Sequence, residues 1–336
     1  MIRQENYPSE THTVTTDDGY ILTIYRIPGP PGSIPVLLQH GLLESSADWL
    51  VPGRGRSLAY MLSDQGYDVW LGNARGNTYS KKHKKFSTSD PRFWDFSWHE
   101  LGIYDLPAMI NYITDLKKDN LFYIGHSMGA SSLCVMAIER PEVAKKVRAM
   151  IGLAPAVYVY RMKASIRMLS PFSREFKWIA NSLGIHEFLP RSNFFDSFAR
   201  YICRSVMLRN AVCGNSLFLI AGFNPDQLDQ IAYDSFQNYD YGVRINWKVY
   251  RTPKPPTYDL SKVQVPIAVF WSRNDWLVGG QDVKRFYSEI PIKIGIHEVE
   301  HKKFNHFDFL WAVNATNLVY TKVLDIMDSY ENQISV

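Results

Sequence analysis

The sequence of 336 residues predicts an α/β fold with a mostly parallel central sheet. Short apolar segments alternate with stretches of helical spacing, a pattern typical of strands that are covered by helices on both faces. The alternation stops near residue 156 and resumes near residue 259. We therefore expect residues 1–155 and 259–336 to form the sheet and its helices, and residues 156–258 to form a helical insertion.

The first third of the chain predicts three strands before the regular alternation begins. His12–Thr16 and Tyr20–Ile27 are rich in β-branched and aromatic residues, and the Asp-Asp-Gly segment between them indicates a hairpin. Ile34–Gln39 is a short apolar run of the kind that forms a buried strand. A helix over Ser57–Asp64 and a strand over Tyr67–Leu71 follow.

The middle of the chain continues with helix, strand, helix and strand. Leu101–Leu116 has apolar residues at helical spacing, and Leu121–Ile124 is a short apolar strand. Ser131–Glu139 is again helical, and Pro141 just beyond it indicates where that helix ends. Val147–Leu153 completes this part as a strand.

The insertion separates this part from the last elements. Phe172, Phe176, Ile179 and Leu183 illustrate its helical spacing, and the prolines of residues 253–256 indicate a linker back to the sheet. Beyond the linker we expect strands over 265–271 and 294–299 and a closing helix over 309–327.

The composition excludes several classes of protein. Apolar residues make up 46% and charged residues 21%, which is ordinary for a folded globular chain and unlike a disordered one. The net charge of +4 is too small to indicate nucleic-acid binding. The polar start of the chain does not predict a secretory signal peptide, and the uncharged stretch 120–138 is too polar for a transmembrane span. Three cysteines are too few for a disulfide framework, and whether Cys203 and Cys213 pair stays open.

The segment Gly125-His126-Ser127-Met128-Gly129 has the Gly-x-Ser-x-Gly pattern. This pattern is typical of a sharp strand-to-helix turn in which small neighbours allow a strained, nucleophilic serine. A chance match in a chain of this length has odds of roughly one in ten. Because a predicted strand precedes the segment and a predicted helix follows it, we interpret Ser127 as a catalytic nucleophile.

A serine nucleophile of this kind requires a carboxylate and then a histidine, each after a later strand. Asp275 follows the strand 265–271 directly. Asp282 and Glu289 lie in the next helical stretch, and we expect them to be surface charges. Asp275 is therefore the predicted acid.

His306 lies between the last predicted strand and the last predicted helix, where the histidine is required. His297 falls inside the strand, while His301 at its end is a closer alternative. In the predicted mechanism His306 takes the proton of Ser127 and Asp275 orients the imidazole, and water then hydrolyses the acyl-serine.

The oxyanion that forms in this reaction needs two backbone N–H donors. The residue after the nucleophile, Met128, supplies one, and Leu42 in the loop after an earlier strand supplies the other. His40 in that loop is as consistent with a structural role as with a catalytic one. The chemistry requires no cofactor, and no His/Cys cluster has the spacing of metal ligands.

Blocks along nearly the whole chain resemble the acid lipase family, which includes gastric lipase and lysosomal acid lipase. The most specific blocks are residues 15–22, 39–43, 72–80, 104–108, 274–277 and 305–309. The resemblance implies an α/β-hydrolase fold and hydrolysis of neutral lipid esters of the triacylglycerol or cholesteryl ester type. It also implies that residues 156–258 form a cap, or lid, that contacts the lipid interface, and that the protein is secreted or lysosomal.

The chain departs from the family in three places. Met128 stands where the family usually has Gln, and Ala221 stands where the family has the disulfide partner of Cys213. The cap is also shorter, between residues 224 and 239, by some tens of residues, which a gene-model artefact would explain equally well. The short cap leaves two alternatives open: a carboxylesterase for short acyl chains, or a lipid-binding protein with weak catalysis.

Overall fold

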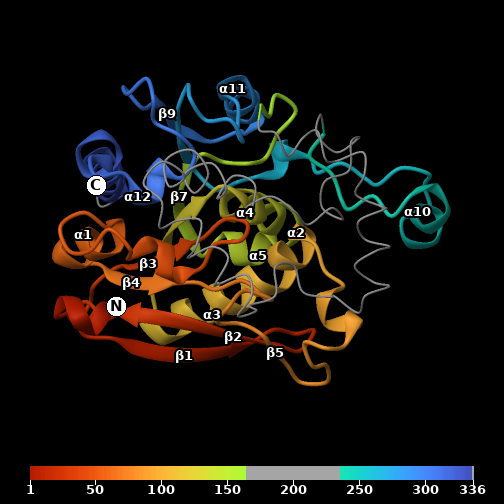
Figure 1. Ribbon diagram of the computed structural model, residues 1–336, viewed down its shortest axis with the longest axis horizontal. Helices are drawn as coiled ribbons and strands as arrows, with labels where there is room; N and C mark the ends of the chain where they lie inside the picture. The colour runs from red at the N-terminus through yellow and green to blue at the C-terminus, as the bar shows by residue number, and fades with distance from the viewer. Residues whose placement is uncertain (164–234, 335–336) are drawn as a thin grey trace, which may run out of the picture.

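One twisted sheet organises the chain (Figure 1), which is described here by a computed structural model covering residues 1–163 and 235–334. Within those residues the sheet has nine strands in the order β1-β2-β4-β3-β6-β7-β8-β9, with β5 paired to β2. The strands are β1 (Glu10–Thr15), β2 (Tyr20–Ile27), β3 (Pro35–Gln39), β4 (Asp68–Leu71), β5 (Lys82–His83), β6 (Leu121–His126), β7 (Val147–Leu153), β8 (Ile267–Trp271) and β9 (Lys293–Glu298).

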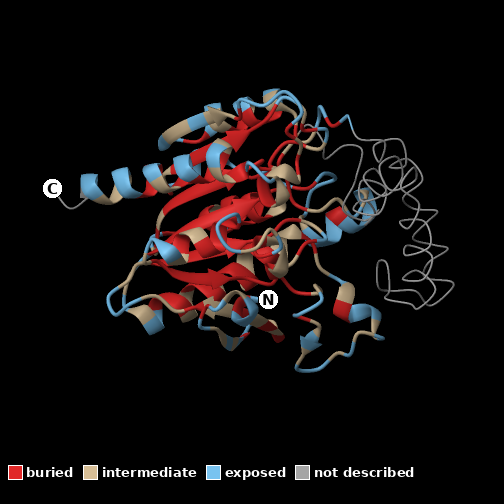
Figure 2. Ribbon diagram, turned by 60° about the vertical axis from the view of Figure 1, so that its left-hand side comes forward, coloured by how far each residue is buried: buried red, intermediate tan, exposed pale blue. Residues whose placement is uncertain are grey.

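The sheet is parallel from β4 to β9 and antiparallel only at its N-terminal side. The predicted hairpin is present: β1 pairs with β2, and Gly19 in the turn has φ +104°, a conformation that favours glycine. The central strands β3, β4, β6 and β8 are buried along their whole length (Figure 2). The prediction of a mostly parallel α/β fold is confirmed.

Helices cover both faces of the sheet. On one face α3 (Leu106–Lys117), α4 (Met128–Glu139) and α11 (Gly280–Glu289) contribute to one apolar cluster, and on the other α1 (Leu58–Asp64), α12 (Asp308–Trp311) and α13 (Thr321–Ile334) contribute to a second. The shorter helical elements are η1 (Ile2–Glu5), η2 (Ser46–Trp49), η3 (Pro91–Trp94), α2 (Trp98–Glu100), η4 (Leu101–Asp105), α5 (Pro141–Ala144), α10 (Val243–Val249), η8 (Leu260–Lys262) and η9 (Thr316–Tyr320).

The predicted helices differ from the structure in three places. The helix predicted from Leu101 begins as the π-helical η4 before α3, where Pro107 lacks the N–H of a regular α-helical bond. The helix after the serine motif begins at Met128, three residues earlier than predicted. The closing helix is interrupted after α12, because Ala312 is extended (φ −65°, ψ 138°) and Asn314, a residue that favours turns, follows it.

Most of the predicted insertion lies outside the described residues, so the cap of residues 156–258 stays a prediction. Of its two ends, the second contains α10 and a β-bridge between Gln237 and Thr257. In Figure 1, α10 lies at the edge of the molecule, away from the sheet. Among the described helices, none combines the length and the hydropathy that a membrane crossing requires.

Candidate active site

The predicted site residues follow the carboxyl ends of four parallel strands. Ser127 comes directly after β6, Asp275 follows β8, and His306 follows β9. Leu42 lies in the loop after β3. Because parallel strands end at the same edge of a sheet, the fold gathers these four segments on one side of the molecule.

Ser127 occupies a strained turn between β6 and α4. Its backbone has φ 52° and ψ −118°, a conformation that residues with side chains adopt only when the surroundings impose it. Its N–H donates to the carbonyl of Leu153 at 2.9 Å, and its own carbonyl accepts from the N–H of Ala156 at 3.2 Å. These two bonds tie the turn to the end of β7 and hold the serine in the geometry expected of a nucleophile elbow.

Three glycines around the turn have no room for a side chain. A Cβ on Gly125 would lie 2.7 Å from the backbone nitrogen of Ala130, and one on Gly129 would lie 2.5 Å from the carbonyl oxygen of Gln39. A Cβ on Gly41, outside the motif, would lie 2.9 Å from the Cβ of Ser127. The motif glycines are therefore required because the β3 loop, β6 and α4 pack in direct backbone contact.

Asp275 and His306 form a buried hydrogen bond. Nδ1 of His306 donates to Oδ2 of Asp275 at 2.7 Å, and both side chains are almost fully buried. The second oxygen, Oδ1, accepts the N–H groups of Leu277 and Val278 at 2.9 and 2.8 Å. The carboxylate is thus fixed by its own loop, and it fixes the ring so that Nε2 is the nitrogen left for proton transfer.

Hydrogen bonds between the two loops hold this pair in place. Oγ of Ser272 donates to the carbonyl of Phe304 at 2.8 Å, and Nδ2 of Asn274 donates to the carbonyl of Lys303 at 2.9 Å. Since neither loop is regular secondary structure, these side chains determine where the acid and the histidine lie.

The other candidates for acid and base have different surroundings. His301 is exposed, and His297 packs its ring against Phe270 at 4.9 Å between centroids, with burial lowering its pKa. The expectation that Asp282 is a surface charge was wrong: its side chain is fully buried and accepts from Arg161 at 2.8 Å. Glu289 is exposed, as expected.

His126 connects the serine turn with the histidine loop. It directly precedes Ser127, its Nε2 donates to the carbonyl of His306 at 3.0 Å, and the two rings lie 4.7 Å apart. No hydrogen bond joins Ser127 to His306 among the described residues. The structure therefore brings the acid and the histidine into contact and positions the backbone of His306 beside the serine turn.

The two predicted oxyanion donors have N–H groups available. Leu42 lies in a turn whose next residue, Leu43, has φ 62°, and within the described residues its N–H has no hydrogen-bond partner. Met128 is the first residue of α4, where the N–H has no partner within the helix. The helix N-terminus also carries partial positive charge, which favours a developing oxyanion.

His40 has bonds that fix its own loop. Its ring is buried, Nδ1 donates to the carbonyl of Gly41 at 2.8 Å, and Nε2 accepts the N–H of Ala74 at 3.1 Å. Burial lowers its pKa, which agrees with a neutral ring that donates at one nitrogen and accepts at the other. Of the two roles left open by the sequence, this geometry favours the structural one.

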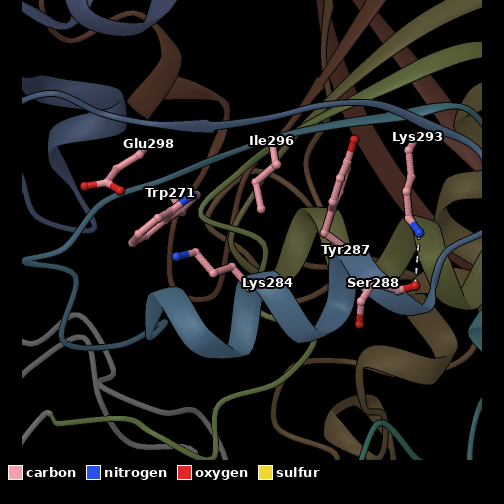
Figure 3. A pocket seen from close by; sticks show the side chains of 7 residues that line it. All are labelled: Trp271, Lys284, Tyr287, Ser288, Lys293, Ile296 and Glu298. Carbon is pink, nitrogen blue, oxygen red and sulfur yellow. Dashed lines mark hydrogen bonds between the residues drawn. The ribbon is translucent and has the colours of Figure 1, made fainter.

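A cavity of about 530 Å³ opens elsewhere, between α11 and β9 (Figure 3). Lys284 lies over the ring of Trp271, with Nζ 4.7 Å from the ring centroid, and Nζ of Lys293 donates to the carbonyl of Ser288 at 3.0 Å. None of the predicted site residues lines this cavity.

Two further predictions concern metal ions and cysteines. Among the residues that the structure describes, no group of three or more His, Cys, Asp or Glu side chains is arranged to hold a metal ion. Cys134 is free and buried, while Cys203 and Cys213 lie outside the described residues.

Comparisons with known proteins identify the fold and the family of the chain. Residues 34–313 match the family described as alpha/beta hydrolase fold, and residues 1–53 match a partial alpha/beta-hydrolase lipase region. Lipase 3 of Drosophila melanogaster is 38% identical over 98% of this chain and 92% of its own length. The lysosomal acid lipase/cholesteryl ester hydrolase of Homo sapiens is 34% identical over 98% of this chain and 90% of its own length.

The chain belongs to the acid lipase family. Relatives in this α/β-hydrolase family align with 98% of the chain, so the acid lipase resemblance in the sequence is confirmed and the chain is a serine ester hydrolase. Solved structures agree at the level of the fold. An esterase from Pyrococcus furiosus superposes with a TM-score of 0.52 at 16% identity, covering 98% of this chain and 95% of its own.

Sequence reasoning about this acid lipase missed two buried residues beside the site. Glu44 and His126 form an ion pair at 2.8 Å, although neither was a candidate. His126 occupies a variable position of the serine motif, and Glu44 lies between Leu43 and Ser45 in the loop after β3, so no spacing pattern connects them. Only the fold, which brings the β3 loop against β6, makes the pair visible.

Proposed function

We propose that the chain hydrolyses carboxylic esters of neutral lipids, of the triacylglycerol or cholesteryl ester type, through a triad of Ser127, His306 and Asp275. The observation that carries the proposal is the buried bond from His306 to Asp275 at 2.7 Å on the edge of the sheet that holds the strained Ser127. The named activities of the lipase relatives support the substrate class.

The proposed reaction uses each residue in turn. Nε2 of His306 takes the hydroxyl proton as Oγ of Ser127 attacks the ester carbonyl, and Asp275 stabilises the imidazolium. The N–H groups of Leu42 and Met128 bind the oxyanion of the tetrahedral intermediate. His306 then protonates the leaving alcohol, and a water activated by the same ring releases the fatty acid from Ser127.

Labelling with a serine-reactive fluorophosphonate tests the nucleophile. The wild-type chain should react, and Ser127→Ala should not react while keeping the thermal stability of the wild type. Ser131→Ala, a change to a second serine on α4, should react normally and serves as the matched control. A folded wild-type chain that fails to react would favour the alternative of a lipid-binding protein with weak catalysis.

A series of p-nitrophenyl esters of increasing acyl length then separates lipase from esterase. The proposal expects kcat/KM to rise with chain length, because a lipid-handling site needs apolar walls to bind long acyl chains. A maximum at acetate or butyrate would support the short-chain carboxylesterase instead.

We further propose that the cap contacts the lipid interface through α10. Its apolar side chains are exposed, including Val243 at 62% and Trp247 and Val249 at 53% each, and exposed apolar clusters mark surfaces that bind other phases or partners. Trp247→Ser should reduce binding to a triolein emulsion and leave hydrolysis of soluble butyrate esters unchanged. Equal emulsion binding by both proteins would contradict this role.

The proposed compartment is secreted or lysosomal, in agreement with the lysosomal acid lipase/cholesteryl ester hydrolase of Homo sapiens to which the chain is similar. The triplet Asn314-Ala-Thr316 is a glycosylation acceptor pattern, and Asn314 is exposed in the turn between α12 and η9. Protein isolated from its own cells should therefore lose mass on glycosidase digestion. An unchanged mass would count against passage through the secretory route.

A further inference from the structure

Glu44 and His126 form a buried ion pair that the proposed triad does not use. Nδ1 of His126 lies 2.8 Å from one carboxylate oxygen of Glu44 and 3.0 Å from the other. The side chain of His126 is fully buried, and that of Glu44 is 5% exposed. An ion pair removed from water in this way is costly unless every remaining polar atom is also satisfied, so its other bonds decide what it does.

The two ring nitrogens of His126 both face atoms that only accept hydrogen bonds. Nδ1 faces the carboxylate of Glu44, and Nε2 faces the carbonyl oxygen of His306 at 3.0 Å. A neutral imidazole carries one proton and would turn a lone pair toward one of these oxygens. The contacts are therefore those of an imidazolium, in which both nitrogens donate.

The carboxylate of Glu44 also holds the loop that carries a predicted oxyanion donor. Its Oε2 accepts the N–H of Gly41 at 2.5 Å, and Gly41 lies against Ser127 and precedes Leu42. The bonds thus run from the Gly41–Leu42 loop through Glu44 and His126 to the backbone of His306. They connect both sides of the serine turn.

We propose that the Glu44–His126 ion pair is a positioning device for the hydrolysis, holding the oxyanion loop and the backbone of His306 in place on either side of Ser127. This inference rests on the proposed function. In it, neither Glu44 nor His126 touches the substrate, and both act through the residues they hold.

The surroundings of the pair favour its charged state. Burial alone would lower the pKa of His126, but the charge of Glu44 and the hydrogen bonds to Glu44 and His306 outweigh it and raise the pKa. Burial alone would raise the pKa of Glu44, but the charge of His126 outweighs it and lowers the pKa. Within the part of the chain that the structure describes, the pair also interacts electrostatically with Asp275, His306, His40 and Asp48.

These directions define the pH range in which the pair acts. Because the pKa of His126 is raised in the folded chain, its contribution is complete below the ordinary value and is lost as the pH rises through the raised value. Because the pKa of Glu44 is lowered, its contribution is present above the ordinary value and is lost as the pH falls through the lowered value. The pair is therefore intact under mildly acidic conditions and fails on the alkaline side when His126 loses its proton.

The charge state of His126 is directly measurable by ¹⁵N NMR of protein labelled at its nine histidines. In an imidazolium the two ring nitrogens resonate close together, whereas in a neutral ring they are widely separated. At pH 6 the wild type should show one buried imidazolium that becomes a neutral ring in Glu44→Gln. A His126 that is neutral in the wild type at pH 6 would overturn the inference.

The pH profile of kcat/KM tests the positioning role with a soluble ester. The wild type should lose activity at alkaline pH, where His126 is deprotonated. In Glu44→Gln the amide oxygen still accepts from Gly41 and the amide N–H₂ faces a neutral His126, so the loop stays in place and the alkaline decline disappears. The same alkaline decline in wild type and Glu44→Gln would contradict the proposal.

Glu44→Ala removes the contact altogether. It should lower kcat about 10- to 100-fold with little change in KM, because small displacements of catalytic groups have effects of this size, and Glu44→Gln should recover most of the loss. A rise in KM alone, or no fall in kcat, would argue against positioning. Asp105→Asn is the matched control, since it neutralises another buried carboxylate, paired with Arg75, and should leave the alkaline decline unchanged.

The outcomes separate this inference from the proposed function. If the wild type fails to react with the fluorophosphonate, the triad is wrong, while the NMR experiment still reports on the pair. If the wild type reacts and His126 is neutral, the triad stands and the pair is not the positioning device proposed here.

Discussion

The two sides of the candidate site are built by different means. Ser127 is held by regular structure: it lies between β6 and α4, and glycines bring the backbones around it into contact. Asp275 and His306 lie on loops, where hydrogen bonds between side chains and backbone carbonyls fix them. The serine side depends on glycines, because their missing side chains leave room for neighbouring backbones. The histidine side depends on polar side chains that hydrogen-bond to backbone carbonyls.

This difference predicts how each side fails. Added volume should damage the serine side, because backbone atoms cannot move away from a new side chain. Removal of a polar group should damage the histidine side, because a loop has no helix or sheet to replace the lost bond. The predictions below test this contrast, beginning with the largest expected effect.

Asp275→Asn should have the largest effect on activity. The amide keeps the size of the carboxylate but can donate to Nδ1 of His306, which favours the tautomer with the proton on the wrong nitrogen. We expect kcat to fall about 10⁴-fold, measured with a p-nitrophenyl ester. Asp282→Asn, at the buried carboxylate that pairs with Arg161, is the control and should keep kcat within a few-fold. Similar losses in both variants would show that the effect is one of folding.

The fold and the serine side could be predicted because their signals are local. The spacing of apolar residues located the central strands β3, β6, β7 and β8 to within two residues at each end, and the Gly-x-Ser-x-Gly motif located the turn. The glycine contacts give the physical reason. The backbones around the turn approach so closely that the motif must have glycine at these positions. The interruption of the closing helix after α12 has a weaker signal, because Ala312 itself favours helix and Asn314 alone indicates a turn.

Chain order is the only basis on which the sequence predicts Asp275 as the acid and His306 as the histidine of the triad. The surroundings of Asp282 were misjudged because its partner, Arg161, is 121 residues away in the sequence. The same limit applies to Glu44 and His126, which are 82 residues apart and meet only through the pairing of β3 with β6. Sequence spacing identifies residues that share an element, whereas partners on different elements emerge only from the topology of the sheet.

Gly129→Ala should have the next largest effect. The new Cβ would lie 2.5 Å from the carbonyl oxygen of Gln39 and 2.8 Å from that of His40, so β3 and α4 must separate. We expect about 1–3 kcal/mol of destabilisation and a loss of kcat of about 100-fold. Gly152→Ala on β7 is the matched control, because its Cβ would meet the flexible end of Met150 at 3.1 Å. The midpoint of thermal unfolding and kcat should therefore both be clearly lower in Gly129→Ala than in Gly152→Ala.

A pair of serine-to-alanine variants gives the smallest and most specific contrast. Oγ of Ser272 donates to the carbonyl of Phe304 at 2.8 Å on the histidine side, and Oγ of Ser132 donates to the carbonyl of Met128 at 3.0 Å on the serine side. In α4 that carbonyl also has its regular helical bond from the N–H four residues later, whereas the loop carbonyl is left unpaired when Ser272 is lost. Ser272→Ala should therefore cost about 1–3 kcal/mol and several-fold in kcat, and Ser132→Ala should change both little. Equal losses of stability and kcat in the two variants would mean that interactions other than the hydrogen bonds between the loops also hold those loops. The two sides of the site would then be stabilised in the same way.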